Sequence, residues 1–152
     1  MIEDIFKVPL KINKPFFSLK DKVTGENHKN KIKRVVGWLK KAKSNYIFIS
    51  SPENVAWLLN IRGFDSPYSP IPNSRLLLTN KGKIFIFSEQ KSCKKLILEK
   101  KLSSREIINK KNFEKFFDNL KKGKIIIDRK SCSLFFENAL RKKFKIVKKE
   151  DP

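Results

Sequence analysis

The chain has 152 residues, which is enough for one hydrophobic core but short for two domains. It is 39% hydrophobic and 34% charged, with a formal net charge of +21, so it is more polar than an ordinary soluble domain. No apolar run approaches the roughly 20 residues of a membrane-spanning helix, and the N-terminus has an acidic start and no apolar leader segment. With two cysteines in all, the chain is expected to be a cytoplasmic protein with free thiols and no membrane partner.

The large positive charge has two interpretations. The basic residues are 30 Lys and 6 Arg, whereas recognition of bases and phosphates favours the planar fork of Arg. Lysines occur from one end of the chain to the other, together with many Ile, Asn and Phe, a composition that A+T-rich codons would produce. A solvated lysine surface is therefore favoured over a specific nucleic-acid site, although charge of this size predicts salt-sensitive adhesion to polyanions.

The first elements along the chain are a connector, a helix, a strand and a second helix. Residues 1–25 carry prolines and lysines without helical or strand periodicity, and they are predicted to lie outside the core as an inter-domain connector. A helix is expected to begin at Thr24-Gly25, with its lysines largely off the apolar face and with Gly37 permitting close packing. That face comprises Ile32, Val35, Val36 and Leu39. Residues 46–49 predict a buried strand, and Ser51 with Pro52 predicts the capped start of a helix ending near Asn60.

The second half alternates strands and helices. Residues 75–79 and 83–87 flank Gly82, whose tolerance of positive φ favours a tight hairpin. The later patterns predict helices at 91–101, 111–121 and 132–142, with strands at 105–109, 124–128 and 144–147. The helix at 111–121 is expected to bury its Phe side chains, and the helix at 132–142, capped by Ser131, is expected to direct Leu134, Phe135 and Leu140 inward. The predicted fold is α/β, a mixed β-sheet with helices packed on it.

Residue types that usually perform hydrolysis are sparse. His28 is the only histidine, and its polar surroundings favour a solvent-facing side chain over a catalytic one. Cys93 and Cys132 are too far apart for a zinc motif. No glycine-rich phosphate loop occurs, and Glu53, Asp65 and Asp128 form no recognisable metal set. The chain alone is therefore predicted to be catalytically inactive.

The stretch from Ser51 to Asn73 differs from the rest because it contains no lysine. Trp57 and Leu58 are expected to pack in the core. Arg62 and Asp65 admit two interpretations: a local ion pair that holds the loop, or an arginine that faces another domain and a substrate. The prolines at positions 67, 70 and 72 are expected to stiffen the loop by fixing φ.

This stretch resembles a known family. Residues 54–65, NVAWLLNIRGFD, followed by PYSP at 67–70, resemble the middle domain of three-domain Xaa-Pro aminopeptidases (aminopeptidase P). Weaker similarity extends over residues 2–7, 16–35, 76–87 and 125–140, and residues 150–152 look like the boundary before the catalytic domain. The sequence departs from the family pattern at Phe64, where a small residue is usual and a Phe would narrow a cleft.

The resemblance implies the remaining expectations. Residues 26–152 would form a creatinase N-terminal-like domain, and the catalytic domain, which is absent here, would follow it in the chain. That domain would hold two divalent metals, usually manganese, on two Asp, one His and two Glu, with a metal-bound hydroxide attacking the bond before proline. The partners would be that domain, a peptide with proline at its second position and further copies in a homo-oligomer. Arg62, Phe64, Asp65 and Tyr68 would be substrate-cleft or inter-domain residues; the alternatives are a basic nucleic-acid-binding domain and a stand-alone assembly domain.

Overall fold

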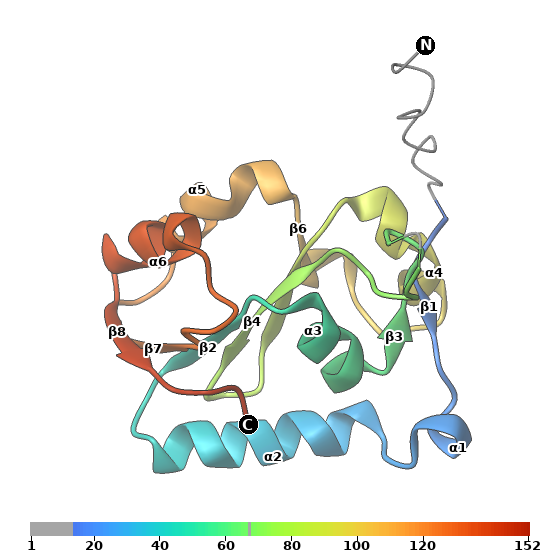
Figure 1. The fold of residues 1–152 in the computed structure, drawn as a ribbon, viewed down its shortest axis with the longest axis horizontal. Helices are drawn as coiled ribbons and strands as arrows, with labels where there is room; N and C mark the ends of the chain where they lie inside the picture. The colour runs from blue at the N-terminus through green and yellow to red at the C-terminus, as the bar shows by residue number, and fades with distance from the viewer. Residues whose placement is uncertain (1–13, 67) are drawn as a thin grey trace.

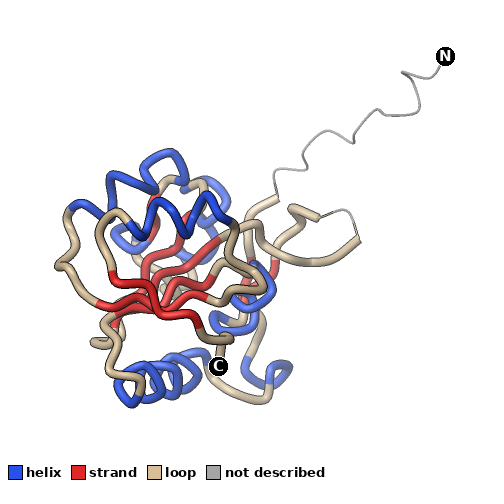
Figure 2. The backbone as a smooth tube through the Cα atoms, turned by 60° about the vertical axis from the view of Figure 1, so that its left-hand side comes forward, coloured by secondary structure: helices blue, strands red, loops and turns tan. Residues whose placement is uncertain are grey.

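The computed structural model describes residues 14–66 and 68–152, and its centre is a six-stranded mixed sheet between two layers of helices (Figures 1 and 2). The strand order is β6-β5-β4-β2-β7-β8. The strands are β2 (Tyr46–Ile49), β4 (Arg75–Thr79), β5 (Ile84–Phe87), β6 (Ile107–Ile108), β7 (Lys124–Ile127) and β8 (Lys145–Lys148). A separate two-stranded sheet pairs β1 (Phe17–Ser18) with β3 (Ile61–Arg62). The α/β prediction is confirmed.

The helices cover both faces of the six-stranded sheet. They are α1 (Asp21–Thr24), α2 (His28–Lys41), α3 (Pro52–Leu59), α4 (Lys94–Leu98), α5 (Phe113–Asp118) and α6 (Leu134–Arg141). Short 3-10 turns occupy Gln90–Cys93, Ser104–Glu106 and Lys110–Asn112. In Figure 1, α2 and α3 lie on one side of the sheet and α5 and α6 on the other.

Strand direction places several loops at one edge of the sheet. β2 is parallel to β7 and β7 to β8, whereas β4 runs against both β2 and β5. β5 is in turn parallel to β6. The carboxyl ends of five strands and the beginning of β4 therefore share an edge, which is where open α/β sheets commonly bind ligands.

Alternation along the strands divides the core into two clusters. Ile47 and Ile49 of β2 face the cluster under α2 and α3, while Phe48 faces the cluster under α5 and α6. The second cluster is aromatic, with the rings of Phe48 and Phe113 at 5.5 Å. The prediction that the helix near residue 113 buries phenylalanines is confirmed, because Phe113 and Phe117 are buried and Phe116 packs beside them.

Several local predictions are also confirmed. The Ser51 hydroxyl accepts from the backbone N–H of Asn54 at 3.3 Å, with Pro52 in the first turn of α3. Asn60 ends that helix at a φ of 51°, and Gly82 turns the β4–β5 hairpin at a φ of 82°. Residues 46–49 form the expected buried strand.

The predicted helix start at Thr24-Gly25 is wrong. Thr24 instead ends α1, Gly25 provides its left-handed cap at a φ of 74°, and α2 begins at His28 behind the Asn27 cap. The lysines of this helix were predicted to lie largely off its apolar face, but Lys31 is buried, with only 3% of its surface exposed.

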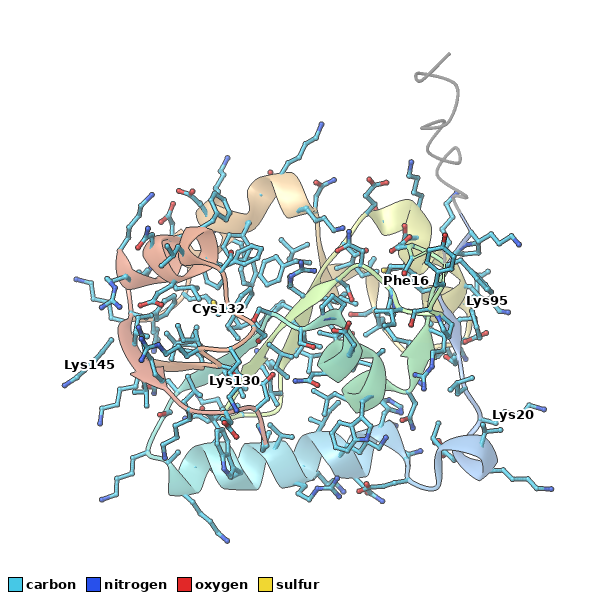
Figure 3. All side chains as sticks on the ribbon, in the orientation of Figure 1. Phe16, Lys20, Lys95, Lys130, Cys132 and Lys145 are labelled. Carbon is cyan, nitrogen blue, oxygen red and sulfur yellow. The ribbon has the colours of Figure 1, made fainter. Side chains whose placement is uncertain are left out.

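Residues 14–25 were predicted to lie outside the core as part of a connector, but this segment packs against the core. Phe16 is fully buried in the cluster under α2 and α3, and its backbone N–H donates to the Ser92 carbonyl at 2.7 Å. Figure 3 shows Phe16 within the packed interior, while the lysines labelled at positions 20 and 145 extend away from it. The expectation for residues 1–13 lies outside the described residues.

The elements after the hairpin are shorter than expected, and one helix face was assigned incorrectly. The segment 91–101 contains the five-residue α4, and β6 has two residues. Ser133, not Ser131, caps α6. Leu140 is buried as predicted, but Leu134 and Phe135 are 76% and 62% exposed, because the helix turns Phe136 toward the core instead.

Candidate functional site

The candidate site is the loop between β3 and β4, which follows the lysine-free helix α3. β3 pairs antiparallel with β1, with Arg62 opposite Phe17, and the Asn60 carbonyl accepts from the backbone N–H of Leu19 at 2.8 Å. Segments distant in sequence therefore hold the base of the loop. In Figure 2 the loop projects away from the six-stranded sheet.

Gly63 fixes the inner side of this loop. A Cβ atom at this position would lie 2.8 Å from both the Phe16 ring and the Pro72 Cα atom, so only glycine permits this approach. The Gly63 N–H donates to the Pro70 carbonyl at 3.2 Å. The loop is thus packed against the core through its own backbone.

Arg62 and Asp65 do not form an ion pair among the described contacts, which was one of the two interpretations of these residues. The Arg62 guanidinium donates through Nη1 to the Ile61 carbonyl at 2.8 Å. The Asp65 carboxylate instead accepts from the backbone N–H of Asn73 at 2.7 Å. Arg62 therefore retains further N–H donors while Asp65 closes the loop.

Phe64 and Tyr68 form the exposed part of the loop. Phe64 is 44% exposed and stacks on Phe17 with centroids 5.5 Å apart, and Lys14 Nζ lies 5.1 Å from its ring. Tyr68 is 98% exposed. Pro67, expected to stiffen the loop, lies outside the described residues. The loop thus presents two aromatic side chains outward.

Trp57 does not pack in the core, contrary to the prediction, although Leu58 does. Trp57 is 44% exposed, with Lys31 Nζ 4.4 Å and Arg34 Cζ 5.6 Å from its ring centroid. Cations at these distances over an indole are attracted by its π face. Trp57 therefore belongs to a surface cluster beside the candidate loop.

The buried Lys31 supports that cluster. Its Nζ donates to the Trp57 carbonyl at 3.0 Å and to Asn60 Oδ1 at 2.7 Å. Burial lowers the pKa of Lys31, while Glu26 opposes the shift. The sequence contained a usable signal, because Lys31 lies four residues before Val35 on the buried face of α2.

The last residues contact the same helix from another side. Asn54 Nδ2 donates to Asp151 Oδ2 at 2.7 Å, and a small cavity of ≈ 110 Å³ separates the C-terminal residues from Trp57 and Leu58. Burial raises the pKa of Asp151. Both flanks of α3 are therefore occupied: the loop follows it, and the C-terminal end of the chain lies against it (Figure 1).

A wide groove of ≈ 600 Å³ lies between α2 and the β4–β5 hairpin. Five lysines line it, at positions 29, 33, 40, 81 and 101, together with His28. His28 is half-buried, and its pKa is lowered by burial and by the nearby Lys101 and Lys29. The prediction that the His28 side chain faces solvent is therefore only partly correct.

The described residues do not provide a metal site. Within 14–66 and 68–152, no three His, Cys, Asp or Glu side chains are grouped so that they could hold an ion. The donor set expected for two divalent metals thus has no counterpart in this part of the chain. No helix in the same ranges is both long and apolar enough to cross a membrane.

Comparison with known proteins identifies the family of the domain. The family model of the Creatinase/Prolidase N-terminal domain matches residues 7–152. A probable Xaa-Pro aminopeptidase P of Coprinopsis cinerea is 35% identical over 63 residues, covering 41% of this chain and 10% of that protein. Xaa-Pro aminopeptidase 1 of Dictyostelium discoideum is 29% identical over 88 residues, covering 58% and 14%. The chain thus spans a small part of these relatives' length.

Solved structures share the fold. An X-prolyl aminopeptidase of Caenorhabditis elegans, described as a cytosolic enzyme with a di-nuclear active site, matches with a TM-score of 0.72 at 17% identity, over 99% of this chain and 26% of that one. An isolated creatinase/prolidase-like N-terminal domain of a Corynebacterium diphtheriae protein matches with a TM-score of 0.58 at 11% identity, over 81% and 98%. The second match is a domain of this fold that was crystallised on its own.

Proposed function

The chain belongs to the creatinase/prolidase N-terminal domain family, and we propose that it is the non-catalytic middle domain of an Xaa-Pro aminopeptidase. Its role would be to form one wall of the substrate cleft and to position the catalytic domain. The substrate would be a peptide with proline at its second position, from which the enzyme removes the first residue. The enzyme would act in the cytoplasm as a homo-oligomer.

The observation that supports this role is the loop after α3. Its backbone is closed by the Asp65–Asn73 hydrogen bond and by the packing of Gly63, so its shape is preorganised. Its outward side chains, Phe64 and Tyr68, make a surface with exposed aromatic area. Arg62 has N–H donors left for a peptide carbonyl or a carboxylate.

The chemistry would reside in the catalytic domain. Two divalent metals there, manganese by family resemblance, would supply the nucleophile and polarise the scissile carbonyl. The described part of this chain offers no clustered ligand set, so its residues would act only by binding and orienting the peptide. Phe64 stands where the family resemblance implies a smaller residue, so its ring would narrow the cleft.

An activity assay tests this division of roles. The purified 152-residue chain, supplied with manganese, should not hydrolyse an Xaa-Pro tripeptide. The longest natural protein that contains these residues should hydrolyse it under the same conditions. Turnover by the 152-residue chain, abolished by a chelator, would contradict the proposal.

A second candidate function rests on the lysine groove beside α2. Five lysines around one groove would attract polyanions whatever their sequence. Binding of single-stranded and duplex DNA should then be lost by physiological salt, without sequence preference. The Phe residues of α5 do not support base stacking, since they face the core.

A further inference from the structure

A cavity of ≈ 470 Å³ opens at the carboxyl edge of the sheet, on the face covered by α5 and α6. It lies between the beginning of β4, the end of β5 and the first turns of the two helices. Its lining residues are Asn73, Arg75, Phe87, Lys110, Lys111, Phe113, Glu114, Phe135 and Phe136. Its volume falls within the range of small-molecule sites, about 300–1,000 Å³.

The floor and one wall of the cavity are aromatic. The ring of Phe113 lies 5.0 Å from those of both Phe87 and Phe136, and Phe87 and Phe113 are buried. Phe135 forms one wall and is 62% exposed. A phenylalanine this exposed gains little stability from burial. These rings can accept a flat apolar group by offset or edge-to-face contact.

Arg75 gives the cavity its charge. Its Nη1 donates to Asn73 Oδ1 and to the Ser74 carbonyl, both at 3.0 Å, and its Cζ lies 5.6 Å from the Phe136 ring. Its Nε is buried without an acceptor. Burial lowers the pKa of Arg75, with Glu53 opposing the shift. No described carboxylate lies within ion-pair distance of this guanidinium, so the half-buried cation has only neutral hydrogen-bond partners, and Glu53 acts on it only from farther away.

The other charged side chains around the cavity do not neutralise Arg75. Glu114 accepts from Lys142 Nζ at 2.9 Å, so its charge is already paired. Lys110 and Lys111 add two cations at the rim. A neutral aromatic ligand would leave the positive charge of Arg75 without a negative partner. A phosphate would leave the aromatic floor of the cavity without an apolar contact.

We propose that this cavity binds a small carboxylic acid with an aromatic body, its ring against Phe113 and Phe135 and its carboxylate on Arg75. The pairing follows from charge and shape, because guanidinium binds carboxylate in a bidentate fork and the lysines at the rim favour an anion. The inference goes beyond the proposed peptidase role and does not depend on it. The same end group could come from a free acid or from the last residue of a peptide.

The test is a titration of the 152-residue chain, whose core is closed on both faces of the sheet. Binding of 3-phenylpropanoate, followed by backbone amide shifts, should perturb the residues at the beginning of β4 and in the first turns of α5 and α6. The matched amide, 3-phenylpropanamide, should bind about tenfold or more weakly, since it lacks the charge that Arg75 pairs with. A tripeptide ending in phenylalanine distinguishes the two sources of the carboxylate. Whichever binds more tightly, the free acid or the tripeptide, is the better model of the ligand.

Variants separate the contributions of charge and apolar contact. Arg75→Met should weaken the acid about tenfold or more and leave the amide unchanged, whereas Arg105→Met, an exposed arginine that precedes β6, should change neither. Phe135→Ala removes an exposed ring, leaves folding intact and should weaken both ligands. Equal affinity for acid and amide, an unchanged Arg75→Met variant that is folded, or no shifts at the cavity would each overturn the proposal.

Discussion

The Asp65 carboxylate accepts a hydrogen bond of 2.7 Å from the backbone N–H of Asn73, eight residues further along the chain. This bond replaces the local Arg62–Asp65 ion pair that the spacing suggested. It closes the loop from within and leaves Arg62 bound to the Ile61 carbonyl alone among the described contacts. The two candidate residues therefore make different contacts: Asp65 closes the loop, and Arg62 is the residue that we propose meets a partner.

Removal of the Asp65 carboxylate should loosen the loop without unfolding the domain. Because the bond is exposed, Asp65→Ala should cost only about 0.5–1 kcal/mol in the free energy of unfolding. Hydrogen exchange at the Asn73 amide should accelerate, and Asp65→Asn, which retains an acceptor oxygen, should restore most of the protection. Unchanged exchange in Asp65→Ala would show that this bond does not hold the loop.

Two glycines should respond in opposite directions to the same substitution. Gly63→Ala places a Cβ 2.8 Å from the Pro72 backbone and should destabilise the domain by about 1–3 kcal/mol. Gly37 was predicted to permit close packing, but apart from its chain neighbours and the backbone of its own helix no atom lies within 4 Å of its Cβ position. Gly37→Ala should therefore stabilise α2 by about 0.5–1 kcal/mol. Chemical denaturation of both variants measures this difference, and equal effects would contradict the packing at Gly63.

His28 should make folding sensitive to mild acid. Burial, then Lys101 and Lys29, lower its folded pKa below 6.5, while Asp21 opposes them. As the pH falls from 6.5 through the folded pKa, the unfolded chain binds the proton first, so the free energy of unfolding decreases. Well above pH 6.5 the imidazole is neutral in both states, and this effect vanishes.

The measurement is direct because the sequence has one histidine, so its imidazole signal needs no assignment. Its titration should give a pKa below 6.5, and Lys101→Met should raise that value, whereas Lys115→Met on the opposite face should not. His28→Gln should remove the acid-dependent part of the stability change. A folded pKa at or above 6.5 would contradict this environment.

The two thiols should react slowly and in a fixed order. Burial raises the pKa of Cys93 and of Cys132 to about 11, so little thiolate is present near pH 8. Cys132 is half-buried and Cys93 fully buried, so alkylation followed by mass spectrometry should label Cys132 first. Denaturant should make the two rates equal. Faster labelling of Cys93 in the native chain would contradict its burial.

The sequence predicted elements whose signals were local. Continuous apolar runs identified the central strands, Ser51 and Pro52 identified the start of α3, and Gly82 identified the hairpin. In each case the residue that determines the conformation lies within the element. The resemblance to the family then supplied the arrangement of these elements, which local patterns do not determine.

The errors occurred where tertiary contacts overrode local patterns. Lys31 is buried because Asn60 Oδ1 and the Trp57 carbonyl, both distant in sequence, accept hydrogen bonds from its Nζ. Phe16 appeared to belong to a connector because its partners, Gly63 and Ser92, come much later in the chain. Phe135 was assigned inward by apolar type alone, but the register set by the Ser133 cap places Phe136 on the core instead.

The kinetics of Arg62 variants test the proposed cleft role most directly. In the longest natural chain containing these residues, Arg62→Ala should lower kcat/KM for an Xaa-Pro peptide by about tenfold or more, as expected when a charged hydrogen-bond donor to the substrate is removed. Arg105→Ala, which removes an exposed arginine elsewhere, should leave kcat/KM unchanged. A folded Arg62→Ala enzyme with unchanged kcat/KM would contradict the account of this loop as a wall of the active-site cleft.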